Sequence, residues 1–198
     1  MPAPRRVSFG IVDCQRFVAT RNRGILRWRL ALVALVAILG LALSVRSRVR
    51  INWTDSLPRG LYLVDAVPKD GVVPGQIVVA CPPRSYAEIG RDRGYLIAGG
   101  CPGGVAPVLK LVAARAGDVL QLSSAGIKVN GSQLPGTTLL AADNHGDPPA
   151  HVAFGIYRVP AGEIWLFTPK PNGYDSRYFG PVPISNVLNI ARPLLTSS

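Results

Sequence analysis

The chain has 198 residues, of which 48% are hydrophobic and 17% are charged. This composition suits one globular domain with an additional segment and excludes an intrinsically disordered chain. No repeat of ~20–50 residues recurs, which excludes repeat and collagen-like architectures. The formal net charge of +11 would by itself suggest a nucleic-acid partner, but the distribution of the charge argues against one.

The N-terminal quarter carries more than half of the excess charge. Residues 1–45 contain seven arginines and one acidic residue, a net charge of +6, whereas residues 46–198 carry +5. An uncharged apolar stretch occupies 30–45, and including 25–29 brings it to the length of a membrane span. Since most arginines precede this stretch, the positive-inside rule predicts a basic cytoplasmic tail at 1–24, a transmembrane signal anchor at 25–45 and an exported domain at 46–198. A cleaved signal peptide is the alternative interpretation.

The three cysteines divide between the two sides of the predicted anchor. Cys14 falls on the reducing, cytoplasmic side, and Cys81 and Cys101 share the exported domain. Two cysteines in an oxidising compartment favour a disulfide, although two buried free thiols are the alternative. No cysteine or histidine spacing indicates zinc.

The exported part shows the pattern of a mainly β domain. Glycine and proline recur too often for long helices, and short aliphatic runs lie between them. The runs expected to form strands are 60–64, 76–80, 119–122, 127–129 and 163–167. Asn130-Gly131 is typical of a hairpin turn, and 108–116 fits either a short helix or a buried strand.

A polar stretch at 136–151 contains both histidines of the chain. His145 and His151 lie beside Asp143 and Asp147, but their spacing matches no metal signature. We therefore expect a solvated loop and no metal.

Serine activated by a neutral lysine is the chemistry that the chain's residues leave open, because the common motifs for other catalytic sites are absent. Three of the four lysines lie in turns or polar segments, and Lys110 alone lies in an apolar run. Burial there would disfavour the ammonium form and so lower the pKa, although a lysine that extends from a strand to solvent is the alternative. Ser56 lies in a turn bounded by Pro58 and Gly60, close behind the predicted anchor.

Four segments, in order, resemble the sequence boxes of the type I signal peptidase superfamily of serine/lysine endopeptidases. They are TDSLP at 54–58, PGQIVV at 74–79, LKLVAARAGD at 109–118 followed by VNG at 129–131, and DSRYFGPV at 175–182. The segments SLPRGLY and PVLK are further similar to the TraF-type branch, the conjugative-transfer peptidases. One departure is Gly173, which stands where general signal peptidases carry a serine.

The resemblance implies a coiled, mainly antiparallel β fold of signal-peptidase type behind one transmembrane helix. It implies that Ser56 is the nucleophile and Lys110 the general base, and that the Ser56 N–H and the Thr54 hydroxyl form the oxyanion hole. Asp175 and Arg177 would support the site, and Asp175 would orient the base. No cofactor is implied.

The resemblance also implies a substrate and a location. The enzyme would mature a propilin of a conjugative or type IV secretion pilus, with cyclisation as one outcome, in contact with membrane lipid and secretion components. Its single-pass anchor would lie in a bacterial inner membrane, with the N-terminus cytoplasmic and the catalytic domain periplasmic. The alternatives are a general signal peptidase and a non-catalytic exported scaffold of the secretion machine.

Overall fold

A computed structural model describes the backbone of residues 14–197, and the side chains of 26–197 except those of residues 42 and 45–47. Its internal contacts divide the chain into two units, Met1–Ser47 and Arg48–Ser198. The division lies close to the boundary predicted at residue 46.

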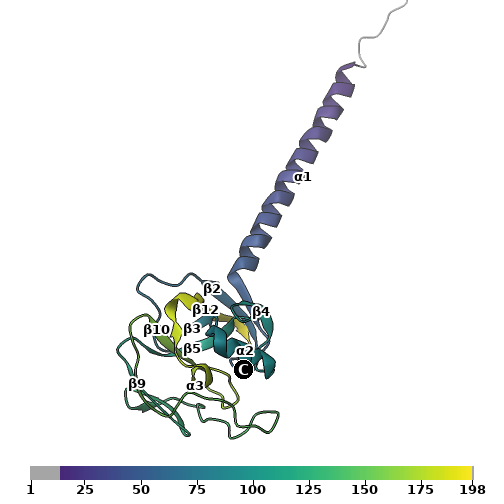
Figure 1. Cartoon of the computed structure of the whole chain (residues 1–198). Helices are drawn as coiled ribbons and strands as arrows, with labels where there is room; N and C mark the ends of the chain where they lie inside the picture. The colour runs from purple at the N-terminus through teal and green to yellow at the C-terminus, as the bar shows by residue number, and fades with distance from the viewer. Residues whose placement is uncertain (1–13, 198) are drawn as a thin grey trace, which may run out of the picture. The chain divides into compact units, whose positions relative to one another are not determined.

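Helix α1, Cys14–Arg48, is the helical element of the first unit (Figure 1). Its large apolar side chains between Leu26 and Leu43 are 58 to 80% exposed where they are described. No helix composed of described residues is both long enough and apolar enough to cross a membrane. The predicted anchor at 25–45 is thus not confirmed and stays a prediction.

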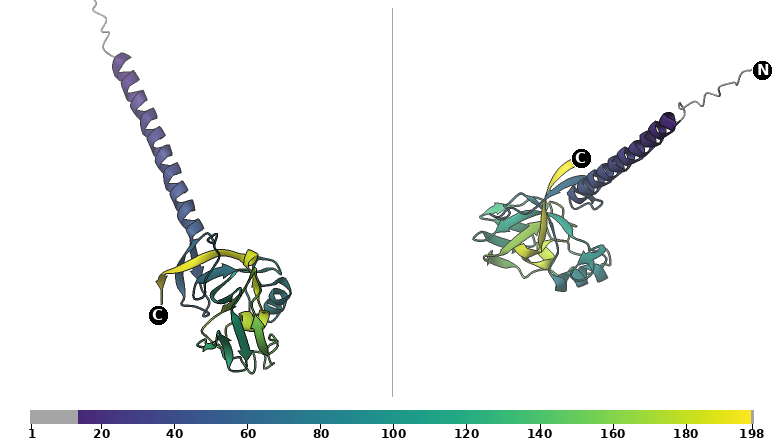
Figure 2. Two further views of the ribbon diagram at one scale, coloured as in Figure 1. Left: turned by 90° about the vertical axis from the view of Figure 1, so that its left-hand side faces the viewer. Right: turned by 90° about the horizontal axis from the view of Figure 1, so that it is seen from above.

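A seven-stranded antiparallel sheet forms the larger part of the second unit. Its order is β1-β2-β12-β3-β5-β10-β11, so strands from both ends of the unit lie side by side. The long C-terminal strand, yellow in Figure 2, pairs with β2 on one side and β3 on the other. The strands are β1 Val49–Asn52, β2 Gly60–Asp65, β3 Ile77–Ala80, β5 Val108–Arg115, β10 Glu163–Phe167, β11 Val182–Pro183 and β12 Val187–Thr196.

A second antiparallel sheet has the order β8-β7-β6-β9. Asn130 and Gly131 join β7 to β8 with φ angles of 50° and 85°, as the hairpin signal predicted. The strands are β6 Val119–Ser123, β7 Gly126–Val129, β8 Ser132–Gln133 and β9 Gly155–Arg158.

The remaining elements are short. Strand β4, Ala98–Cys101, forms isolated bridges to Val105, and helix α2, Arg84–Asp92, precedes it. Helix α3, Ser176–Phe179, and the 3-10 helix η1, Ile184–Asn186, follow β10. All five runs predicted as strands are strands, and 108–116 is the buried strand β5.

Strands β5 and β10 are packed on both faces, which places the centre of the larger sheet inside the protein. On one face Val112 and Leu166 join a core that includes Val78 of β3. On the other face Trp165 and Ala114 pack against side chains of the smaller sheet, including Leu120, Leu122 and Ile127. A side chain of β5 can therefore be fully desolvated in either direction.

Candidate active site

Ser56 lies in the turn between β1 and β2, and the buried side chain of Asn52 organises that turn. Asn52 Nδ2 donates to the carbonyl oxygens of Thr54, Leu57 and Pro58 at 3.1, 2.9 and 3.1 Å. Its Oδ1 accepts from the backbone N–H and the hydroxyl of Thr54 at 3.2 and 2.8 Å. One side chain thus satisfies polar groups along the whole turn. Asn52 belongs to no sequence motif named above, although asparagine ahead of a turn is a recognised signal for such bonds.

The Ser56 hydroxyl lies 3.1 Å from the Thr54 hydroxyl. A hydroxyl has one proton, and that of Thr54 is donated to Asn52, so Ser56 is the donor in this pair. The predicted oxyanion role of Thr54 therefore requires its hydroxyl to turn away from Asn52. By contrast, none of the hydrogen bonds found among the described residues uses the backbone N–H of Ser56, which leaves that donor available.

Lys110 is the buried lysine of the second unit. Its side chain is 3% exposed on β5, whereas Lys69, Lys128 and Lys170 are exposed. Desolvation lowers the pKa of Lys110 from 10.5 to about 8, against the opposing field of the Asp175 carboxylate. Arg177 lowers the pKa further. A substantial neutral fraction near pH 8 is what a general base requires.

Ser56 and Lys110 line the same cavity, which has a volume of about 540 Å³. The hydrogen bonds of the described residues do not include one between their side chains. The cavity wall also includes apolar groups suited to an extended peptide, among them Trp53, Val79, Ile97 and Leu109. The geometry thus brings the predicted nucleophile and base to one solvent-connected site.

Asp175 and Arg177 form a fully buried ion pair beneath the site. Both side chains are 0% exposed, and Arg177 Nε and Nη2 each lie 2.8 Å from an Asp175 oxygen. Arg177 also donates to the carbonyl oxygens of Thr138, Lys170 and Gly173. The Asp175 oxygens accept hydrogen bonds from the Arg177 side chain and from backbone N–H groups. The hydrogen bonds found among the described residues do not include one from Lys110 to Asp175. Asp175 therefore acts on the base through its field, and the pair organises the chain around it.

Thr168 connects this buried pair to the nucleophile turn. Its hydroxyl donates to the Ser56 carbonyl oxygen, and its N–H donates to Asp175 Oδ2 at 2.8 Å. Thr168 is 0% exposed. Nothing in the local sequence singles it out, because its two partners lie in other segments of the chain.

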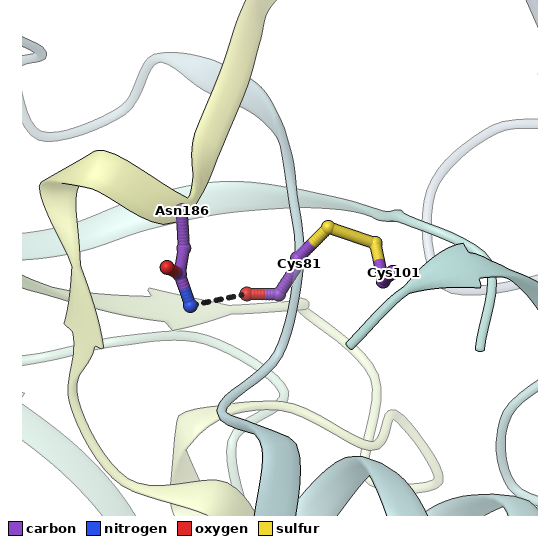
Figure 3. Close-up of a disulfide and its surroundings, with 3 residues drawn as sticks. All are labelled: Cys81, Cys101 and Asn186. Carbon is purple, nitrogen blue, oxygen red and sulfur yellow. Dashed lines mark hydrogen bonds between the residues drawn. A yellow bond between two sulfur atoms is a disulfide. The ribbon is translucent and has the colours of Figure 1, made fainter. Parts of the chain in front are cut away.

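The predicted bridge between Cys81 and Cys101 is present, with a Cα–Cα distance of 5.6 Å (Figure 3). It joins the residue after β3 to the end of β4, and the Asn186 side chain donates to the Cys81 carbonyl oxygen at 3.3 Å. Residues 95–97 and 106–107, on either side of β4, line the cavity. The bridge thus holds one wall of the site, while the side chain of Cys14 lies outside the described residues.

The loop at 136–151 is less solvated than the sequence predicted. His145, Asp147 and His151 are exposed, but the Asp143 side chain is only 3% exposed. Asp143 accepts from the Tyr95 hydroxyl, from Arg93 Nη1 at 3.2 Å and from two backbone N–H groups of its own loop. The Tyr95 hydrogen bond is the main cause that lowers the pKa of Asp143 to about 2. These contacts tie the loop to the end of α2.

No group of three or more His, Cys, Asp or Glu side chains in the described part of the chain is arranged to hold a metal ion.

Comparison with known proteins identifies the class. The family model described as "Signal peptidase, peptidase S26" matches residues 23–195, so the chain belongs to that family of peptidases. The crystal structure of a signal peptidase I from Enterococcus faecalis V583 aligns with a TM-score of 0.37 and 15% identity, covering 63% of this chain and 98% of that one.

The curated relatives are more specific. A probable conjugal transfer protein TraF from Sinorhizobium fredii is 40% identical over 74% of this chain and 77% of its own length. A conjugal transfer protein TraF from Agrobacterium fabrum is 36% identical over 84% of this chain and 96% of its own length. A plasmid transfer protein TraF from Escherichia coli is 36% identical over 74% of this chain and 82% of its own length.

Proposed function

We propose that this protein is a serine endopeptidase of the conjugative-transfer type, with Ser56 as nucleophile and Lys110 as general base. The observation that carries the proposal is the buried Lys110, whose pKa is lowered to about 8 in the cavity that Ser56 also lines. Family membership supports a peptidase, and the names of the relatives support conjugal transfer as its context.

The reaction starts when Ser56 Oγ bonds to the carbonyl carbon of the scissile peptide and its proton passes to neutral Lys110 Nζ. The C–N bond then breaks as Lys110 returns the proton to the leaving amine, and Ser56 holds the acyl group as an ester. Water next gives a proton to Lys110 and attacks the ester, and Ser56 regains that proton when it leaves. An amine of the substrate in place of water would form a new peptide bond, which is the route to a cyclic product.

The Ser56 N–H supplies one donor to the oxyanion, and Thr54 supplies the second once its hydroxyl leaves Asn52. Asp175 and Arg177 hold the surrounding chain and balance the charge near the base.

The substrate in this proposal is the precursor of a pilin of a conjugative or related secretion pilus. Residues 25–45 anchor the enzyme in the inner membrane with the N-terminus cytoplasmic and 46–198 periplasmic, where it meets its substrate at the lipid surface. The uncharged stretch behind the arginines supports this topology, as do the exposed apolar side chains of α1. Active reporter fusions at Ser198 in the exported compartment alone, together with an intact N-terminus, are the expected results. A mature protein whose N-terminus lies near Val45 would instead indicate that residues 25–45 are a cleaved signal peptide.

The test of the chemistry compares Ser56→Ala, Lys110→Ala and the double variant. Each single change should lower pilin processing at least about 1,000-fold, and the double variant should be no worse, because the two groups act as a unit. His145→Ala is the control and should process normally. Near-normal activity of Lys110→Ala would overturn the dyad, and a pilus assembled by Ser56→Ala cells would indicate a scaffold.

Mass spectrometry of the pilin separates linear from cyclic products, and cleavage of unrelated exported precursors would indicate a general signal peptidase.

A further inference from the structure

The nucleophile turn is held by two kinds of hydrogen bond. Asn52 donates to the carbonyl oxygens of Thr54, Leu57 and Pro58, and the Tyr62 hydroxyl also donates to that of Pro58 at 2.7 Å. These donors belong to the two strands that the turn connects, so they set its internal shape. The Ser56 carbonyl instead accepts from Thr168, which is 112 positions further along the chain. The carbonyl oxygens of Thr54, Ser56, Leu57 and Pro58 thus accept one hydrogen bond from a donor outside residues 52–62, as far as the described residues show, and that donor is Thr168.

The strand register places Thr168 beside the base. Strand β10 pairs with β5 antiparallel, and the last pair is Phe167 with Leu111. One further step in this register sets Thr168 opposite Lys110. Directly opposed residues of an antiparallel pair project their side chains from the same face. Thr168 therefore bonds the carbonyl of Ser56 and directly follows the strand that pairs with the strand of Lys110.

Gly173 makes room for this arrangement. A Cβ atom at residue 173 would overlap the Thr168 Cγ2 methyl and would approach Thr168 Cβ to 3.1 Å and the Lys170 carbonyl oxygen to 3.3 Å. Gly173 has an ordinary backbone conformation, so the requirement for glycine is one of space. Here the volume of a side chain at 173 is occupied by Thr168.

We propose that Thr168 is a positioning residue that fixes the Ser56 backbone beside Lys110, and that Gly173 lacks a side chain because Thr168 fills its place. The inference rests on the proposed function of Ser56 and Lys110. It assigns to Thr168 no bond to substrate and no proton transfer. Its effect is on the distance between two reacting groups, where a displacement of about 1 Å can cost ~100-fold in rate.

The first test measures cleavage of a purified pilin precursor by the full-length protein and its Thr168 variants. Thr168→Val removes the hydroxyl at nearly constant volume and should lower kcat about 10- to 100-fold with KM changed less than about twofold. Thr168→Ser keeps the hydroxyl and should retain kcat within about threefold. Thr137→Val is the matched control, because Thr137 is also buried and its hydroxyl bonds the Leu134 carbonyl and the Ile127 N–H. That variant should lose thermal stability without losing kcat.

The second test uses the steric pair. Gly173→Ala alone should lower kcat, and adding Thr168→Ser should restore part of it by removing the methyl that the new Cβ meets. Normal kcat in Thr168→Val, or additive losses in the double variant, would overturn the proposal. A fall in both Tm and kcat for Thr168→Val, with no recovery in Thr168→Ser, would show a merely structural role.

A third measurement separates this inference from the proposed function. NMR titration of protein with ¹³C-labelled lysine follows Lys110 directly, since the chain has only four lysines. If Thr168 holds the turn over Lys110, the Lys110 pKa should rise towards 10.5 in Thr168→Val and stay at its wild-type value in Thr168→Ser and Thr137→Val. An unchanged pKa in Thr168→Val would count against the positioning role. If the wild-type protein showed no cleavage that depends on Ser56, the proposed function would be wrong. The titration would still test whether Thr168 positions the turn.

Discussion

Asn52 accepts two hydrogen bonds from Thr54 through a single oxygen, one from the backbone N–H and one from the hydroxyl. This relationship commits the Thr54 hydroxyl proton to Asn52. It also makes the Ser56 hydroxyl the donor in its contact with Thr54. The turn is therefore ordered without substrate, and in the proposed mechanism the second oxyanion donor becomes available by rotation of the Thr54 hydroxyl.

Asn52→Ala should lower kcat about 10- to 100-fold, because the turn that carries Ser56 loses all the bonds of this side chain. It should also cost about 1–3 kcal/mol in the free energy of unfolding, since buried carbonyl groups lose their donor. Steady-state kinetics and urea unfolding measure the two effects. Asn189→Ala is the control, because Asn189 makes one bond to the Asp65 carbonyl far along the sheet. Equal kinetic losses in the two variants would contradict a specific role for Asn52.

Activity should rise with pH through about 8 and then level off, because Lys110 must be neutral to accept the Ser56 proton. A pH–rate profile of kcat/KM from pH 6 to 10 checks this. A profile that rises near pH 6.5 instead would indicate a histidine base, and His145→Ala and His151→Ala would then be the variants to compare.

The same pKa makes stability depend on pH. The folded pKa of Lys110 lies below its ordinary value of 10.5, so between about 8 and 10.5 the unfolded chain binds more protons at this residue than the folded one. The Lys110 contribution to stability therefore improves as pH rises through that window. Below pH 8 the destabilisation caused by burying the Lys110 ammonium group no longer changes with pH. Because Lys110→Met removes this buried charge, it should raise the free energy of unfolding at pH 7 by about 1–3 kcal/mol. Lys128→Met, at an exposed position, should change it little, and a destabilised Lys110→Met protein would contradict the argument.

Asp175→Ala should destabilise the domain by about 3–5 kcal/mol, because it leaves the Arg177 charge buried without its partner. Circular dichroism during thermal unfolding measures the loss. The control is Asp65→Ala, which breaks the exposed pair with Arg192 and should cost less than about 1 kcal/mol. Comparable losses of stability in both variants would mean that burial of the Asp175–Arg177 pair does not increase the cost of removing its carboxylate.

Reduction of the Cys81–Cys101 bridge should cost about 3 kcal/mol by the entropy of the released loop. Cleavage activity should fall with it, since the bridge holds a wall of the cavity. Non-reducing peptide mapping should recover Cys81 and Cys101 as one linked pair. The Cys14→Ser variant is the control, and recovery of Cys81 and Cys101 as free thiols from the exported compartment would contradict the bridge.

Local patterns were sufficient for most of the strands, but not for the two residues at the centre of the proposed chemistry. Runs such as 164–167 are β-branched, aliphatic and aromatic, and they are bounded by turn residues, so their conformation is decided within a few positions. A turn around Ser56 and an apolar run around Lys110 each left an ordinary structural role open, and both residues were selected by the resemblance of four ordered segments to the signal peptidase boxes. The pairing of Cys81 with Cys101 was predicted because the expected anchor separates both of them from Cys14.

The tertiary structure decided the contacts whose partners are distant in the chain. Thr168 reaches Ser56 across 112 positions, and Asp143 is buried because Arg93 and Tyr95 approach it from another segment. The steric limit at Gly173 comes from nearby positions, the Thr168 methyl and the Lys170 carbonyl oxygen, but it too depends on how the chain folds there. A hydrogen bond or a steric exclusion depends on distances of a few Å, and for these residues strand order and register set those distances. The sequence therefore predicted which groups could react, and the pairing of β5 with β10 in the tertiary structure brought Thr168 into the proposed site.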